Sequence, residues 1–200
     1  MKTTRTALPG WVTTQVEAHT EASVDLAEVL PTVLEVAEMM CERYAAGGVL
    51  YTFGNGGSAA DAQHLTGELI GRYRRERRPL AAVTLSTDAT VMTCVGNDYS
   101  FDEAFSRQVE ALARPKDVVA GFSTSGRSPN VVKALAAAKE RGATTVLFCG
   151  KNLGPAAEHA DYVLAAPVTF TARIQEMHTL MLHLISEHVD AWAAGEEPTA

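Results

Sequence analysis

Five short apolar runs alternate along this chain with segments of helical periodicity, and this alternation restricts the fold more than any other feature. Continuous apolar runs are typical of strands that are buried on both faces of a sheet. Such strands, separated by helices, form right-handed βαβ units. The pattern therefore predicts an α/β fold with a mostly parallel sheet of about five strands. The predicted strands cover Val49–Phe53, Leu80–Leu85, Asp117–Phe122, Thr144–Cys149 and Tyr162–Ala165.

We expect a single domain over residues 1–200, with its α/β core in residues 49–194. Residues 1–23 are predicted to form an N-terminal arm or short helix. Residues 24–46 carry apolar positions at helical spacing, which Pro31 kinks or divides and Gly47-Gly48 ends. This helix could pack inside the chain or supply a subunit interface, and the sequence leaves both possibilities open.

Charge and cysteine content exclude several functional classes. The formal net charge of −7 argues against broad nucleic-acid binding, and the basic cluster Arg72–Arg78 is interpreted as a solvated helix end. Three widely spaced cysteines form no disulfide framework, and the first ten residues lack the apolar core of a signal peptide. No apolar run reaches the ~18 residues of a membrane helix. These features predict a cytoplasmic protein with no membrane partner.

A glycine-rich stretch, Gly54–Gly57, joins the first predicted strand to a helix predicted from Ala59 to Tyr73. Glycine there permits a positive φ and lets a ligand approach the backbone. Ser58 is the expected N-cap of this helix, with Asp61 completing a capping box. The free N–H groups at such a helix start bind anions, so the stretch indicates a phosphate site.

A second candidate phosphate loop, Ser123–Ser128, follows the third predicted strand and holds four hydroxyl side chains. Ser128 is the expected N-cap and Pro129 the first residue of the next helix. Hydroxyls and helix N–H groups together can satisfy the oxygens of one phosphate. A nucleotide-dependent enzyme is a rival interpretation, because Gly54–Ala59 matches the dinucleotide fingerprint in its alanine form. That match is weak, since the acidic residue expected near the end of the next strand is missing.

His64 and Glu68 lie four residues apart, on one face of the helix that follows the first loop. The last predicted helix, from Arg173 to about Ala194, adds Gln175, His178 and His183 among apolar residues. A polar side chain in so apolar a helix is either paired in the core or functional. Spacing allows only one of the two histidines to share the site of Glu68 and does not select which.

These residues carry a resemblance to a known family. The sequence is similar to the phosphoheptose isomerases of the sugar-isomerase (SIS) family, over nearly the whole chain after the N-terminal arm. The motifs occur in order and at family spacing. They are Gly54-Asn55-Gly56-Gly57-Ser58, His64 with Glu68, Gly96-Asn97-Asp98, Ser123-Thr124-Ser125-Gly126-x-Ser128, and Arg173-Ile174-Gln175-Glu176 with His183.

The resemblance implies a three-layer αβα sandwich, the SIS fold, in a homotetramer whose active sites are built across subunit interfaces. By match to the motifs, Glu68 and His183 would be the catalytic acid/base pair. In family members that hold zinc, one ion per subunit would be bound by the residues matching His64, Glu68, Gln175 and His183. The implied substrate contacts are Asn55, Gly56, Gly57, Ser58, Glu68, Arg72, Asn97, Asp98, Ser123, Thr124, Ser125, Ser128 and Gln175.

The implied activity is an aldose–ketose isomerisation of D-sedoheptulose 7-phosphate to D-glycero-D-manno-heptose 7-phosphate through an enediol, the first step of activated-heptose biosynthesis. A carboxylate can move the carbon-bound proton and an imidazole can serve the oxygens, while zinc could polarise the carbonyl. The alternative is a non-catalytic SIS protein that senses a sugar phosphate or acts as a scaffold for a partner such as a replication initiator. A pure binding module has no need of Glu68, His183 and Gln175 together, which favours the enzyme.

Overall fold

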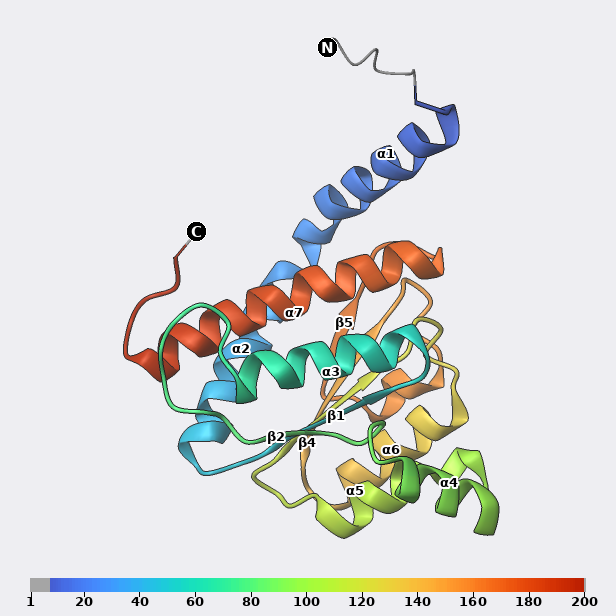
Figure 1. The fold of residues 1–200 in the computed structure, drawn as a ribbon, viewed down its shortest axis with the longest axis vertical. Coiled ribbons are helices and arrows are strands. Elements are labelled where there is room, and N and C mark those ends of the chain that lie inside the picture. The colour runs from blue at the N-terminus through green and yellow to red at the C-terminus, as the bar shows by residue number, and fades with distance from the viewer. Residues whose placement is uncertain (1–7, 200) are drawn as a thin grey trace, which may run out of the picture.

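A computed structural model describes residues 8–199 and contains a five-stranded sheet in which every strand runs parallel to its neighbours (Figure 1). The spatial order of the strands is β2-β1-β3-β4-β5. The predicted parallel sheet is therefore confirmed, and the bounds of the last two strands match the prediction. The strands are β1 (Leu50–Gly54), β2 (Ala82–Thr84), β3 (Val118–Phe122), β4 (Thr144–Cys149) and β5 (Tyr162–Ala165).

Helices cover both faces of the sheet and make a three-layer sandwich, as the resemblance implied (Figure 1). One face packs against α2, α3 and α7, and the other against α5 and α6. The helices are α1 (Gly10–Asp25), α2 (Leu30–Ala45), α3 (Gly57–Ile70), α4 (Ala89–Asp98), α5 (Ser106–Leu112), α6 (Pro129–Glu140) and α7 (Thr171–Ala194). Short 3-10 turns occupy Leu26–Glu28, Phe101–Glu103 and Pro155–His159.

Side chains that alternate along each strand build the two cores. Phe122 and Phe148 face α7, and their rings stack with centroids 4.1 Å apart. Phe53 faces the opposite layer, where it stacks on Phe105 at 5.1 Å. Successive side chains of a strand point to opposite faces, so these continuous apolar runs supply both cores at once.

The N-terminal segments differ from their predicted bounds. Residues 1–7 of the predicted arm lie outside the described residues, and α1 is longer than the short helix expected there. The helix predicted over residues 24–46 begins only at Leu30, because a 3-10 turn precedes it and Pro31 occupies its first turn. The predicted division at Pro31 is confirmed. Helix α1 projects away from the sandwich (Figure 1).

The strand order places the loop that follows β1 beside the loop that follows β3. The chain leaves β1 for β2 on one side and later returns to β3 on the other side of β1. Ligands of open parallel sheets bind at such a reversal, beyond the carboxyl ends of the strands. The loops after β1 and β3 meet there. Within residues 8–199, no helix combines the length and the apolar character needed to cross a membrane.

Candidate functional site

The glycine turn after β1 starts α3 two residues earlier than predicted, at Gly57 and not at Ala59. Gly56 has a φ of +57° and is the residue before the first helical residue, Gly57. The prediction of Ser58 as N-cap is therefore wrong: Ser58 lies inside the first turn, and no side chain caps the helix. A Cβ at Gly57 would lie 2.4 Å from the Nε2 atom of Gln175, so a side chain there would displace that amide. The N–H groups at this helix start thus lack a side-chain cap, as an anion site requires.

A reciprocal amide pair joins this turn to the loop after β3. The Nδ2 atom of Asn55 donates to Oδ1 of Asn130, and Nδ2 of Asn130 donates to Oδ1 of Asn55, each at 2.9 Å. Asn130 is buried on the first turn of α6. The motif analysis did not select Asn130, because its role depends on a contact between loops 75 residues apart.

The hydroxyl-rich loop between β3 and α6 is tightly folded. Gly126 has a φ of +62°, and the Oγ atoms of Ser123 and Ser128 lie 3.3 Å apart. Ser128 holds the predicted N-cap position and Pro129 follows as the first helical residue, but the Ser128 hydroxyl makes no capping hydrogen bond. It faces Ser123 instead, which leaves the start of α6 free for an anion.

A cavity of about 140 Å³ opens beside this loop and is positively charged. Its lining includes Thr124, Ser125, Arg127 and Lys151, and no carboxylate. Lys151 lies just beyond the end of β4. It comes close to the loop after β3 because β4 pairs with β3 in the sheet. Sequence reasoning missed this lysine because nothing in its local pattern marks a ligand.

A second group of side chains lies farther along α3, where it faces α7. Nε2 of His64 lies 3.0 Å from Oε1 of Glu68 and 3.3 Å from Nε2 of His183. The Glu68 side chain is 19% exposed and that of His64 is 40% exposed, so the group opens to solvent. Burial lowers the pKa of His183, and the charge of His64 lowers it further while Glu68 raises it. The Tyr73 ring adds to this group, with its centroid 5.7 Å from that of His183.

This second group has the donor set of a metal site. Each of the three side chains offers one ligand atom, and these atoms all lie within 4.8 Å of one another. Two imidazole nitrogens bound to one tetrahedral zinc at 2.0–2.1 Å would lie about 3.3 Å apart, which is the separation found here. Two nitrogens and a carboxylate oxygen form a three-ligand set that leaves a position open for substrate, so the residues fit a catalytic zinc.

Gln175 does not join these three residues within one chain. Its amide lies against Gly57 at the start of α3, and about 12 Å of helix rise separates it from His183. The prediction that Gln175 belongs to the same ligand set is therefore not met inside a single chain. The physical reason is that positions eight residues apart share a side of the helix at different heights.

His178 on α7 and Asp61 on α3 form a separate pair. His178 is fully buried and its Nε2 bonds to the carbonyl of Cys149 at 3.1 Å. Its Nδ1 atom lies 3.9 Å from the Oδ2 atom of Asp61, and neither atom has a hydrogen-bond partner. Burial lowers the pKa of His178 to about 4 and raises that of Asp61 to about 6. Of the two histidines left open by spacing, His183 therefore shares the site of Glu68.

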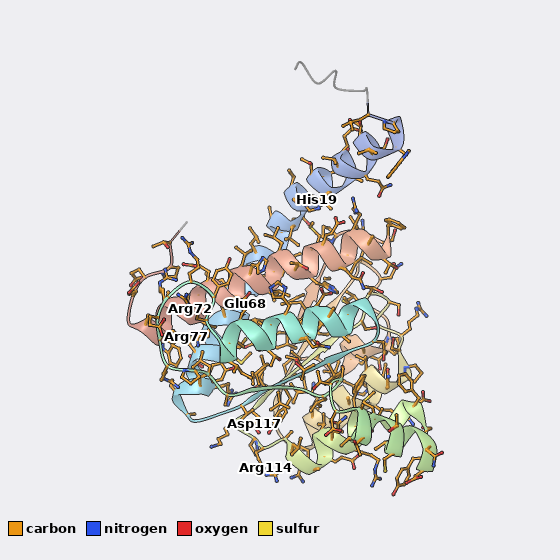
Figure 2. All side chains as sticks on the ribbon, viewed as in Figure 1. His19, Glu68, Arg72, Arg77, Arg114 and Asp117 are labelled. Carbon is orange, nitrogen blue, oxygen red and sulfur yellow. The ribbon has the colours of Figure 1, made fainter. Side chains whose placement is uncertain are left out.

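The remaining predicted contacts lie at the edges of these groups. Asn97 and Asp98 are hydrogen-bonded to each other at 2.7 Å, in the last turn of α4. Arg72 follows α3, and its exposed side chain lies 3.9 Å from Glu76. Figure 2 shows Arg72 near Glu68 and Arg77, at the end of α3.

Comparisons with known proteins agree with the sequence motifs. The SIS domain family model matches residues 19–150. A phosphoheptose isomerase of Geotalea daltonii is 43% identical over 186 residues, which cover 92% of this chain and 97% of that protein. A phosphoheptose isomerase of Aquifex aeolicus is 45% identical over 175 residues, with coverages of 88% and 86%.

Solved structures of phosphoheptose isomerases also match this chain. The phosphoheptose isomerase of Neisseria gonorrhoeae is 39% identical and superposes with a TM-score of 0.85, covering 90% of this chain and 97% of that one. The enzyme from Francisella tularensis is 30% identical with a TM-score of 0.88 and the same coverages. A Vibrio vulnificus NanR protein complexed with ManNAc-6P, at 14% identity and a TM-score of 0.60, shares the fold alone and covers 90% of this chain and 64% of that one.

Proposed function

This chain belongs to the phosphoheptose isomerases of the SIS domain family, and we propose from this membership that it interconverts D-sedoheptulose 7-phosphate and D-glycero-D-manno-heptose 7-phosphate. It is a sugar-phosphate isomerase that acts in activated-heptose biosynthesis. The single observation that carries this function on the structure is the convergence of His64, Glu68 and His183 between α3 and α7. The nucleotide-dependent and scaffold alternatives gain no such support.

The chemistry assigned to the group requires two proton movements. Glu68 is the proposed base: it removes a proton from C1 of the ketose, which leaves an enediol, and returns a proton to C2. His183 is the proposed partner for the oxygens, passing a proton from O1 to O2. Its lowered pKa keeps the imidazole neutral and able to accept a proton near neutral pH.

Zinc is the cofactor that this donor set fits best, at one ion per subunit. His64, Glu68 and His183 would hold it, and Gln175 is proposed as the fourth ligand. When bound, zinc supplies Lewis-acid polarisation of the substrate carbonyl. The neutral state favoured at His183 suits a metal ligand, because a protonated imidazole cannot bind.

The phosphate is proposed to bind at the loop between β3 and α6. Ser123, Thr124, Ser125 and Ser128 supply hydroxyls, and the start of α6 supplies N–H groups. Lys151, in the adjoining cavity, adds a positive charge that the hydroxyls cannot provide. The sugar contacts are assigned to Asn55, Gly56, Gly57, Ser58, Glu68, Arg72, Asn97, Asp98 and Gln175.

Active sites shared between copies of the chain explain the spacing of these groups. About 16 Å of helix rise separates Gly57 from Glu68 along α3, so the phosphate loops and the proposed base lie at opposite ends of one helix. A second copy that brings its loops to this group would shorten the gap. It could also deliver the Gln175 that the group lacks.

A homotetramer is the proposed assembly. An apolar groove of about 370 Å³ lies between α2 and α7, lined by Leu34 and Leu184, which are 48% and 41% exposed. Trp11 and Val16 on the projecting α1 are exposed as well. An exposed apolar groove of this kind marks protein–protein contact. We further propose that residues 1–200 form one SIS domain.

The cytoplasm is the proposed location. Cys41, Cys94 and Cys149, all within the described residues, are free. Unpaired cysteines suit a reducing compartment.

Product identification tests the function directly. The purified chain is incubated with sedoheptulose 7-phosphate and zinc, and the mixture is followed by NMR. Appearance of the anomeric signals of an aldose heptose 7-phosphate supports the isomerase. Binding of the sugar phosphate without any product would indicate a sensor or scaffold instead.

A further inference from the structure

The segment between α3 and β2 crosses the ends of α3 and α7 and buries two of its arginines. The Arg77 side chain is fully buried and that of Arg75 is 9% exposed. The interpretation of Arg72–Arg78 as a solvated helix end is wrong for these two residues, because acidic side chains of α7 pair with them. A buried charge must be paired, so this arrangement is fixed by specific contacts.

Arg77 closes the C-terminal end of α3. Its Nη2 donates to the carbonyl of Glu68 at 2.6 Å, and its Nη1 donates to the carbonyls of Leu69 and Gly71 at 2.8 and 3.1 Å. The last carbonyls of a helix have no partner within the helix. The guanidinium supplies those partners and places a positive charge at the negative end of the helix dipole.

Asp190 of α7 holds the other side of Arg77. Its Oδ1 accepts from Nε of Arg77 at 2.9 Å, and its carboxylate accepts the backbone N–H groups of Tyr73, Arg74 and Arg75 at 3.3, 3.2 and 2.8 Å. Burial raises the pKa of Asp190, but these hydrogen bonds outweigh burial and hold the pKa below its usual value. Asp190 therefore stays charged and bonded near neutral pH.

We propose that Arg77 and Asp190 are positioning residues that set the separation of Glu68 on α3 from His183 on α7. The proposal rests on the proposed function of those two side chains. Arg77 binds the carbonyl of Glu68 itself, and Asp190 lies seven residues, or about two turns, beyond His183 on the same side of α7. Asp190 also fixes the backbone of Tyr73, whose ring lies against His183.

Stability alone does not account for this pair. A buried ion pair adds little net stability compared with apolar side chains of the same volume, whereas its directional bonds specify one geometry. Arginine is needed for that geometry, because one planar fork reaches the carboxylate with Nε and the helix carbonyls with both Nη atoms. Lysine keeps the charge but cannot make all these bonds at once.

Two matched lysine substitutions test the proposal. Arg77→Lys removes the fork that closes α3. Arg75→Lys, two residues away, alters an arginine that pairs with Glu187, Glu196 and Asp190 but donates to no carbonyl of α3. Each variant is assayed for kcat and KM with sedoheptulose 7-phosphate, for Co²⁺ affinity by visible absorption of the bound ion, and for Tm.

We expect Arg77→Lys to lower kcat and Co²⁺ affinity by about 10–100-fold with a smaller change in KM, because residues that orient ligands have effects of this size. Arg75→Lys should stay within about threefold of the wild type in both. Equal losses in the two variants, or wild-type kcat and Co²⁺ affinity in Arg77→Lys, would overturn the proposal.

Asp190→Asn provides a second test of the same contacts. If Arg77→Lys fails to fold, Asp190→Asn is measured with the same assays and the same expected losses. Wild-type protein that binds Co²⁺ but does not isomerise the sugar phosphate contradicts the proposed function alone. The Co²⁺ titration of the variants still decides whether Arg77 positions the group.

Discussion

The Nε2 atoms of His64 on α3 and His183 on α7 lie 3.3 Å apart. These residues are 119 positions apart in the chain, and only the packing of α3 beside α7 on one face of the sheet brings them together. Glu68 completes the group one turn after His64. The packing of α3 against α7 therefore sets the positions of all three side chains.

Replacing His64 should abolish tight metal binding. His64→Ala removes one of three ligand atoms, and we expect zinc affinity, measured by competition with a chromophoric chelator, to fall by at least ~100-fold. His159→Ala, on a 3-10 turn of the opposite layer, is the control and should bind zinc as the wild type does. Unchanged affinity in His64→Ala would show that the metal binds elsewhere.

Gly126 should tolerate no side chain. Its φ is +62°, and a Cβ would lie 1.7 Å from the carbonyl oxygen of Leu153. We expect Gly126→Ala to lower the free energy of unfolding in urea by more than about 2 kcal/mol and to raise KM, because the loop must shift. Gly10→Ala, where a Cβ meets nothing within 4 Å, should cost little. Equal effects of the two changes would argue against a rigid loop.

His178 should make the protein sensitive to acid. Burial lowers its pKa from 6.5 to about 4, so the native state resists a proton that the unfolded state accepts. The stabilisation from neutral His178 is complete above pH 6.5 and is lost as the pH falls toward 4, by about 3 kcal/mol.

Comparison with His178→Gln isolates this effect, since the amide can still donate to the carbonyl of Cys149. Urea unfolding at pH 4, 5, 6 and 7 should show a steeper acid loss in the wild type than in the variant. Asp61, whose pKa is raised to about 6, acts in the opposite direction in both proteins. Parallel pH profiles would contradict the assignment to His178.

The apolar groove on α2 should be required for self-association. Leu34→Glu places a charge in that groove and is expected to shift the protein to a smaller species in native mass spectrometry, with a loss of activity. Leu112→Glu, on the opposite layer and 44% exposed, should leave the assembly intact. A wild-type mass for Leu34→Glu would remove this face from the interface.

Local patterns were sufficient for the sheet and for most helices. The runs Thr144–Cys149 and Tyr162–Ala165 form strands with the predicted bounds. Short, continuous apolar runs between turn residues are typical of buried strands. The start of α3 was harder to predict. Ser58 has the residue type of an N-cap, but the positive φ of Gly56 starts the helix before it.

Contacts distant in sequence were beyond prediction from pattern. Nothing local distinguishes the buried Arg77 from the exposed Arg72, since burial depends on Asp190, more than a hundred residues later. Lys151 reaches the loop after β3, and Asn130 reaches the loop after β1, only through the strand order. Spacing could not separate His178 from His183, because that choice depends on how α7 is rotated against α3.

The most direct test of the account is proton exchange at C1 of sedoheptulose 7-phosphate in deuterated water, followed by NMR with and without zinc. The wild type should incorporate deuterium as the aldose appears. Glu68→Gln should exchange about 10²–10⁴-fold more slowly while still binding the sugar phosphate, because it keeps the shape of the base without its charge. A wild type that binds the sugar phosphate without exchange, or a Glu68→Gln variant that exchanges at the wild-type rate, would contradict the account.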